Sequence, residues 1–230
     1  MAFGMPHRHF AATDSTNTRA RELAAAGTPH GTVVTAAEQS AGRGRQGRTW
    51  AAPAGKALLY SAVVRPLGAR HLMLPLAVPL AVCAAAEELR PEIECGVKWP
   101  NDVHLDGRKL AGVLIEARPQ DGWAVVGVGL NLTIAPEEFP AELRETAISL
   151  GTEMAPEVLG RHLAHWVEAD AEPVLAAWRQ RDVLRGREVS WDGGSGVADG
   201  VDERGYLLVV TADGDRVAVG AGEIHIGRLA

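Results

Sequence analysis

The sequence predicts an α/β protein, with helices and strands over residues 1–184 and a small all-β unit over residues 185–230. Three observations support this prediction. Apolar residues at helical spacing alternate with strand-like apolar runs along the first part. After Arg185 only short strand-like runs between Gly/Asp turns remain. The composition, 47% hydrophobic and 23% charged residues, is that of an ordinary globular protein and excludes disorder and fibrous repeats.

The first part begins with an expected helix over residues 15–26 and an expected strand over residues 32–38. A loop rich in Gly and Arg follows at 41–50, and the next strand is expected at 56–64. An apolar helix is expected over 70–90, with a most apolar run of about fifteen residues. Because a membrane-spanning helix needs about twenty apolar residues, we interpret this segment as a buried helix.

Three strands and a helical region complete the first part. A short strand at 97–99 runs into a Pro-Asn-Asp corner, and longer strands are expected at 110–117 and 123–132. Residues 155–181 have apolar positions at helical spacing, and Pro173 is expected to kink or interrupt that helix. The all-β unit then contributes four strand-like runs, Glu188–Trp191, Tyr206–Val210, Arg216–Val219 and Glu223–Ile226.

Charge and cysteine content exclude several classes of function. The net charge of −6 argues against a protein coated with basic residues for nucleic acid, although a local basic site is compatible with it. The two cysteines, Cys83 and Cys95, lie in no Cys/His cluster, so the sequence gives no support for a zinc site. Nothing requires an oxidising compartment, and no signal peptide precedes the first helix, so a cytoplasmic location is expected.

The strongest local motif is the run GRGRQGRTW at residues 42–50. It fits the GxGxxG pattern and nearly fits the phosphate-binding P-loop, but both patterns require a helix directly after the glycines. Here Pro53, Gly55 and a strand follow instead, so we reject both assignments. The glycines leave backbone N–H groups approachable, and three arginines supply donors for carboxylate or phosphate. A solvated basic turn or an RNA-binding segment is the alternative interpretation.

Four further motifs are weaker when taken singly. KWPND at 98–102 fits an amide and a carboxylate at a sheet edge, or an ordinary turn. KLAGVLIE at 109–116 places a lysine at the mouth of an apolar strand, where it could neutralise charge or simply reach water. GVGLNL at 127–132 fits a flat ligand against the sheet, or a bulged strand. DSTN at 14–17 offers hydroxyls to a polar group, or a helix cap.

Together and in this order, these motifs resemble those of the biotin protein ligases, or biotin–[acetyl-CoA-carboxylase] ligases. The resemblance covers most of residues 10–185, and the β-rich tail is similar in kind to the small SH3-like C-terminal domain of that family. It implies a mixed β-sheet flanked by helices, followed by that small domain. It also implies a reaction in which biotin and MgATP form biotinyl-5′-AMP, and a lysine of a biotin carboxyl carrier domain then receives the biotin.

The resemblance also implies roles for individual residues. Ser15, Thr16 and Gln39 would bond the ureido ring of biotin, and Gly112 and Gly129 would form the floor of its slot. Gly42, Arg43 and Gly44 would close over biotin. The implied biotin-binding set is Ser15, Thr16, Gln39, Gly42, Arg43, Gly44, Lys109, Gly112 and Gly129.

For the nucleotide, Arg45 would retain the adenylate, Arg48 would meet ATP phosphates, and Lys109 would bridge the biotin carboxylate and the α-phosphate. Asp102 would orient or deprotonate the incoming lysine, and Trp50 would pack beside the closed loop. The implied ATP-binding set is Arg45, Arg48, Trp50, Asn101, Lys109 and Asn131, and the catalytic set is Lys109, Arg45, Asp102 and Arg43. Mg²⁺ would be held through ATP, with no protein ligand assigned.

Two departures from the family pattern matter. Gln46 stands where many members carry a second arginine, which removes one charge from the loop. The matched region starts within about a dozen residues of Met1, so no operator-binding winged helix and no repressor activity are expected. No membrane partner is expected, and the oligomer would be a monomer or a homodimer. The rival interpretations are a lipoate or octanoate ligase-type acyl transferase and a nucleotide- or RNA-binding module.

Overall fold

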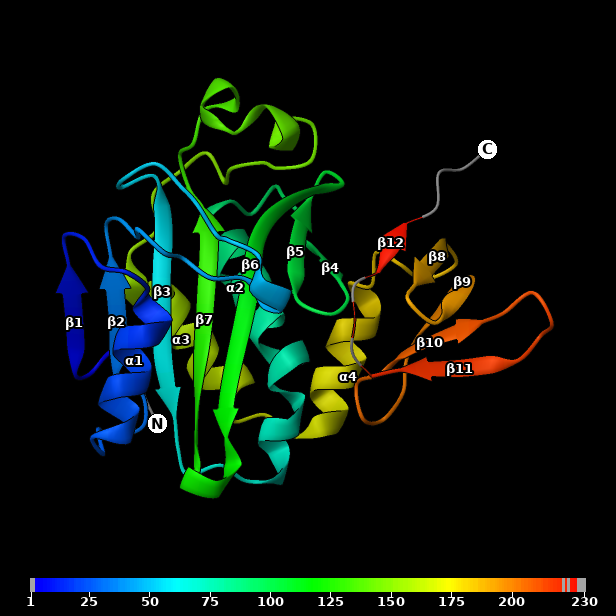
Figure 1. Cartoon of the computed structure of the whole chain (residues 1–230), viewed down its shortest axis with the longest axis horizontal. Helices are drawn as coiled ribbons and strands as arrows, with labels where there is room; N and C mark the ends of the chain where they lie inside the picture. Colours follow the sequence, from blue (N-terminus) through cyan, green and yellow to red (C-terminus); the bar gives the residue numbers. More distant parts are fainter. Residues whose placement is uncertain (1–2, 221, 223, 227–230) are drawn as a thin grey trace.

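A seven-stranded mixed sheet and a five-stranded antiparallel sheet organise the chain (Figure 1). This computed structural model describes residues 3–220, 222 and 224–226. The strands of the larger sheet are β1 (His7–Phe10), β2 (Val33–Ala36), β3 (Ala57–Val64), β4 (Gly96–Lys98), β5 (Asp102–Leu105), β6 (Arg108–Arg118) and β7 (Trp123–Asn131). They lie in the order β1-β2-β3-β7-β6-β5-β4, and β1 pairs with β2 in parallel while the other neighbours are antiparallel.

Helices cover both faces of this sheet, which confirms the predicted α/β class. One face carries α1 (Thr16–Ala25), and the other carries α2 (Leu74–Leu89) (Figure 1). The helices α3 (Pro156–Trp166) and α4 (Ala171–Gln180) pack on α2. Short 3-10 turns lie at Arg45–Gly47, Ala69–Met73, Pro119–Asp121, Pro136–Glu138 and Ala141–Leu143.

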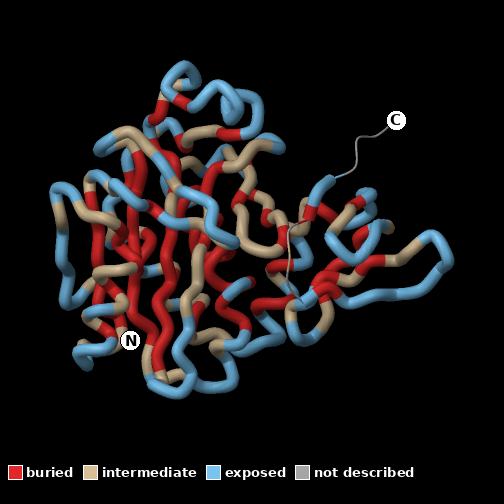
Figure 2. The backbone as a smooth tube through the Cα atoms, in the orientation of Figure 1, coloured by how far each residue is buried: buried red, intermediate tan, exposed pale blue. Residues whose placement is uncertain are grey.

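Alternation along the central strands decides which side chains face which layer. On β7, Val126, Val128 and Leu130 join the large core on the α2 side, because successive residues point to opposite faces. The residues between them, Gly127 and Gly129, face the α1 side. Figure 2 shows β3 and β7 buried along most of their length, beneath the largely exposed 42–50 loop. The α1 side of the sheet is therefore the side on which glycines leave space.

The C-terminal sheet contains β8 (Glu188–Trp191), β9 (Gly194–Val201), β10 (Leu207–Val210), β11 (Arg216–Val219) and β12 (His225–Ile226), in the order β11-β10-β9-β8-β12. Its buried residues belong to the same apolar cluster as α2. The Trp99 indole Nε1 also donates a 3.0 Å hydrogen bond to the Gly205 carbonyl oxygen. The two sheets therefore share one core.

The structure differs from the sequence-based expectation in three strands and one helix. β1 and β5 are not among the expected strands, and β9 covers residues interpreted partly as a turn. Gly196 is required in β9, because a Cβ there would lie 2.8 Å from Val209 Cγ1 and would overlap the backbone of β10. The expected helix over 155–181 is two helices, and Pro173 lies in the first turn of α4 rather than at the break.

The apolar helical segment Ala69–Leu89 is long and apolar enough, by length and composition, to cross a membrane. In this structure 67% of its most apolar window is buried inside the protein. Cys83 lies within it and is fully buried, as expected for a small core residue. The segment is the central helix of the core.

The expected last strand, Glu223–Ile226, includes residue 223, which lies outside the described residues. In the structure β12 covers His225–Ile226.

Candidate active site

A cavity of about 310 Å³ lies on the α1 side of the larger sheet, beneath the 42–50 loop. Its volume is within the range of small-molecule sites. Of the site residues predicted from the sequence, all but one line this cavity, namely Ser15, Thr16, Gln39, Arg43, Gly44, Arg45, Arg48, Trp50, Asn101, Asp102, Lys109, Gly112, Gly129 and Asn131. The exception, Gly42, lines a second hollow that adjoins the loop.

Two glycines on neighbouring strands form the cavity floor. Gly112 on β6 pairs with Gly129 on β7, so their Cα hydrogens leave a flat strip between the strands. The Trp50 indole lies on this strip, because a Cβ at Gly129 would be 2.7 Å from its Nε1. That Nε1 is buried and has no hydrogen-bond partner among the described residues. A flat surface that a glycine pair provides to an indole also suits a flat ligand.

Hydroxyl and amide groups gather at one end of the cavity. The backbone N–H and the hydroxyl of Thr16 donate to Gln39 Oε1 at 2.6 and 3.0 Å. Ser61 Oγ on β3 lies 2.8 Å from Thr16 Oγ1, and Ser15 is 3% exposed at the start of α1. Ser15 makes no side-chain capping bond to α1, and the Gln39 side chain accepts from the first backbone N–H of the helix instead. These hydroxyls are thus turned to one another and to the cavity.

Charged groups gather at another part of the cavity. The Lys109 ammonium forms a 2.7 Å ion pair with Asp102, and its Nζ lies 5.9 Å from the centroid of the Trp50 ring. The Asn101 Nδ2 donates to the Val113 carbonyl oxygen at 2.8 Å, which fixes the Pro-Asn-Asp corner against β6. Burial lowers the pKa of His104, two residues along β5, and the Asp102 carboxylate opposes that shift. His104 is therefore neutral at pH 7.

The loop folds back on itself as a short hairpin over the cavity. The Trp50 N–H donates to the Gly42 carbonyl at 3.0 Å, and the Gly44 N–H donates to the Arg48 carbonyl at 2.7 Å. Gly42 is needed at the base, because a Cβ there would be 2.7 Å from Gln39 Nε2 and would overlap the Trp50 carbonyl. At the exposed tip, Gln46 adopts a φ of 54°, which is uncommon outside glycine.

Two predicted residues make contacts that the sequence did not suggest. Asn131 is 4% exposed, and its Nδ2 donates to the Ile148 carbonyl at 3.0 Å, so its amide holds the following loop as well as lining the cavity. Arg43 lines the cavity, but its guanidinium binds Glu116 through both terminal nitrogens.

Sequence reasoning missed Glu116 and Asn17, although both lie in motifs that it singled out. Alternation offered a signal for Glu116, because Gly112, Leu114 and Glu116 are two residues apart on one strand and share its cavity-side face. Asn17 carried no such signal, since its role depends on the packing of α1 against β7. Gly127 allows that packing, because a Cβ there would be 2.9 Å from Asn17 Nδ2.

The cavity does not resemble a protein metal centre. Among residues 3–220, 222 and 224–226, no group of three or more His, Cys, Asp or Glu side chains is placed to hold a metal ion. Lys109 neutralises the cavity's one carboxylate among the described lining residues, Asp102. The other charged lining residues, Arg43, Arg45 and Arg48, give the cavity a cationic character.

Comparison with known proteins identifies the family. Residues 9–132 match the Biotin/lipoate A/B protein ligase family, and residues 185–227 match the Biotin protein ligase C terminal domain. The chain is 39% identical to the biotin–[acetyl-CoA-carboxylase] ligase of Mycobacterium tuberculosis, over 93% of this chain and 86% of that protein. It is 32% identical to the ligase of the same name from Paracoccus denitrificans, over 94% of this chain and 99% of that protein.

Solved structures agree with the sequence relatives. The biotin protein ligase of Aquifex aeolicus, solved in complex with biotin and ATP, superposes with a TM-score of 0.81 at 28% identity. The match covers 97% of this chain and 100% of that one. The chain therefore belongs to the biotin/lipoate A/B protein ligase family. Because its C-terminal region matches the biotin protein ligase domain, it groups within that family with the biotin protein ligases.

Proposed function

We propose that this protein activates biotin with MgATP to biotinyl-5′-AMP and then transfers the biotinyl group to a lysine of a biotin carboxyl carrier domain. One observation carries the proposal. A single cavity holds a hydroxyl–amide end at Thr16 and Gln39, a glycine floor, and the Lys109–Asp102 ion pair. These features suit the ureido group, the fused rings and the reacting carboxylate of biotin in turn. The relatives described above are named as biotin ligases.

The first step brings two anions together, and cationic side chains make that possible. A carboxylate oxygen of biotin attacks the α-phosphorus of ATP, and the bond to pyrophosphate breaks. Lys109 would stabilise the charge that develops between the carboxylate and the α-phosphate, since fixed cations in a shielded site act most strongly on the transition state. Arg45 and Arg48 line the same cavity and would hold the phosphates.

The second step needs an acceptor for one proton. The lysine amine of the carrier attacks the biotinyl carbonyl, the bond to AMP breaks, and AMP leaves with the electron pair. The Asp102 carboxylate lies 2.7 Å from the Lys109 ammonium, beside the proposed reaction centre. There it would orient the incoming amine and take its proton.

We assign Mg²⁺ to the ATP phosphates rather than to a protein site. Lys109 already occupies the carboxylate that the described lining residues offer. When bound, the ion would neutralise phosphate charge in the first step. The absence of operator binding, the monomeric or dimeric state, the lack of a membrane partner and the cytoplasmic location stay predictions.

The decisive experiment is the exchange of labelled pyrophosphate into ATP, with biotin, lipoate and octanoate as parallel substrates. We expect exchange with biotin alone. Exchange with lipoate or octanoate but not biotin would keep the adenylation chemistry and discard the substrate. The comparisons disfavour that alternative, because the C-terminal match is to a biotin protein ligase domain.

If folded protein with Mg²⁺ present shows no pyrophosphate exchange with any of the three acids, the proposal is overturned. That result would favour a nucleotide- or RNA-binding module instead. The structure gives that module little support, because the arginine-bearing loop faces the cavity and one of its arginines is bound by a carboxylate of the same chain.

A further inference from the structure

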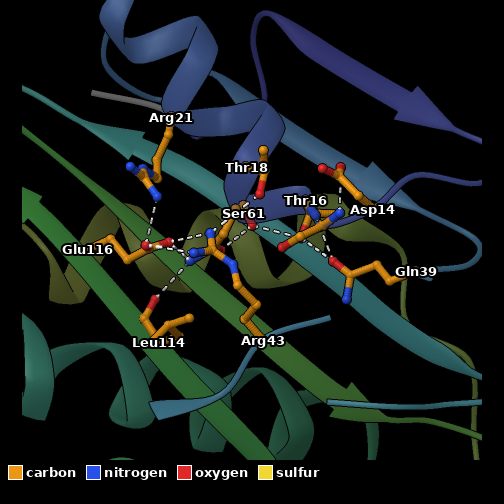
Figure 3. Close-up of polar contacts among 11 residues, drawn as sticks. Asp14, Thr16, Thr18, Arg21, Gln39, Arg43, Ser61, Leu114 and Glu116 are labelled. Carbon is orange, nitrogen blue, oxygen red and sulfur yellow. Dashed lines mark hydrogen bonds and ion pairs between the residues drawn. The ribbon is translucent and has the colours of Figure 1, made fainter. Parts of the chain in front are cut away.

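Glu116, near the end of β6, forms ion pairs with two arginines from different parts of the chain (Figure 3). The Arg43 guanidinium donates to it through Nη1 at 3.1 Å and Nη2 at 2.9 Å, one nitrogen to each carboxylate oxygen. Arg21 on α1 donates to the same carboxylate at 3.1 Å. Glu116 does not line the main cavity, and its side chain is 24% exposed. This carboxylate lines the second hollow beside the loop, so any effect that it has on the main cavity passes through other residues.

The contact with Arg43 fixes one arm of the loop. Arg43 lies between Gly42 and Gly44, where the backbone is least constrained by side chains. A two-point pair between guanidinium and carboxylate restrains both position and orientation, unlike a single hydrogen bond. Arg43 Nη2 also lies 3.4 Å from Thr18 Oγ1 on α1. Arg43 thus connects this arm of the loop to β6 through Glu116 and to α1 through Thr18.

A continuous line of polar contacts joins Glu116 to the hydroxyl–amide end of the cavity. Asn17 Nδ2 donates to Glu116 Oε2 at 2.9 Å, and Asn17 Oδ1 accepts from Ser61 Oγ at 2.6 Å. The Thr16 hydroxyl lies 2.8 Å from Ser61 Oγ, and the Thr16 backbone N–H donates to Gln39 Oε1 at 2.6 Å. Asn17 and Ser61 are 4% and 0% exposed, so these bonds are shielded from water.

We propose that Glu116 is a positioning residue that anchors the 42–50 loop over the cavity through Arg43. Asn17 and Ser61 couple this anchor to the Thr16–Gln39 end. Loop closure and biotin binding are then coupled, because the Thr16–Gln39 end, which is proposed to hold biotin, lies on the same line of contacts as the anchor. The coupling to biotin rests on the proposed function, whereas the anchoring of the loop does not.

The first test is limited trypsin digestion without ligand, because Arg43, Arg45 and Arg48 are cleavage sites within the loop. Glu116→Gln removes the charge and leaves two arginines facing one amide. We expect its loop to be cut at least about fivefold faster than in the wild type, as local opening becomes easier. Glu88→Gln is the matched control, because Glu88 also binds two side chains, Arg161 and His162, on the α2–α3 surface.

If the 42–50 loop is cut at the same rate in the Glu116→Gln and Glu88→Gln variants, the proposed anchoring role of Glu116 is wrong. Thermal unfolding of each variant shows whether it is folded. If Glu116→Gln unfolds, Glu116→Asp provides the second measurement, because it keeps the charge and shortens the side chain. The shorter carboxylate loses the two-point contact with Arg43, so this loop should also be cut faster than the wild-type loop. A wild-type rate in Glu116→Asp would contradict the proposal.

The second test separates positioning from a merely structural role. In pyrophosphate exchange we expect the KM for biotin to rise about tenfold in Glu116→Gln, with kcat changed by less than about threefold. Biotin should also protect the wild-type loop from trypsin at lower concentrations than it protects the variant. A fall in kcat with an unchanged KM for biotin would overturn the coupling. Exchange that is absent from the wild type would instead refute the proposed function and leave the digestion result standing.

Discussion

The cavity floor is buried and held by strand pairing, whereas the loop above it is largely exposed and held by a few side-chain contacts. Gly112 and Gly129 are fixed by the register of β6 and β7 and have no side chain to rearrange. Arg43 is fixed by one carboxylate, and its side chain is 37% exposed. Changes in the floor therefore act through shape, and changes in the loop or its anchors act through charge.

Lys109 joins the two regions, and its removal should have the largest effect. It lies on β6 at the edge of the floor, and its proposed role is to supply positive charge. We expect Lys109→Ala to slow biotin-dependent pyrophosphate exchange by about 10²–10³-fold, the usual loss for one group that stabilises transition-state charge. The matched control is Arg108→Ala, which removes the neighbouring cation on the same strand. Near-normal exchange in Lys109→Ala would exclude it from the site.

The floor itself is tested by adding one methyl group at a time. In Gly129→Ala the new Cβ overlaps the Trp50 indole, so the ring must move and the unfolding free energy should fall by about 1–3 kcal/mol. Biotin-dependent exchange should fall with it. In Gly112→Ala the Cβ would be 3.1 Å from Trp50 Cζ3, so the loss should be smaller. Urea unfolding measures both variants, and equal losses would contradict the placement of the indole.

The smallest effect is expected at an exposed ion pair beside the cavity. The side-chain hydrogen bond from Arg19 lowers the pKa of Asp14 from 3.8 to about 2. A lowered folded-state pKa means that this stabilisation is present above pH 3.8 and is lost as the pH falls toward about 2. Because Asp14 is 41% exposed, Asp14→Asn should cost less than about 1 kcal/mol at pH 7.

Chemical denaturation at several pH values checks this expectation. The difference in unfolding free energy between wild type and Asp14→Asn should narrow below pH 3.8 and disappear near pH 2. A difference that is constant over this range would show that the substitution acts by packing rather than by charge. Arg216 and Asp199, an exposed pair on the C-terminal sheet, provide a second pair for comparison through Asp199→Asn.

Much of the fold can be predicted because its elements carry local patterns. β3, β6 and β7 are long apolar runs, and α2 is an apolar helix, so composition and spacing indicate each of them. β9 carries a weaker pattern, because three glycines lower its strand propensity and the partner that requires Gly196 lies on β10. β5 is short and follows directly after a Pro-Asn-Asp corner that resembles an ordinary turn.

The candidate site, like the fold, is predictable where its residues lie close together in the sequence. Residues within a contiguous motif, such as Gly42 to Trp50, are grouped by the sequence itself. Glu116 stands 73 positions from Arg43, and Asn17 stands 99 positions from Glu116, so their contacts exist only in the folded chain. Sequence motifs indicate which side chains meet a ligand, whereas the residues that hold those side chains in place depend on tertiary packing.

The Trp99 hydrogen bond to Gly205 connects the C-terminal sheet to the segment that leads into the candidate site. Trp99 is 3% exposed, and the chain reaches Asn101 and Asp102 within three residues of it. One indole ring therefore connects the β9–β10 turn to the corner that carries Asp102. In the proposed reaction, the C-terminal sheet thus supports the segment that carries the group expected to meet the incoming lysine.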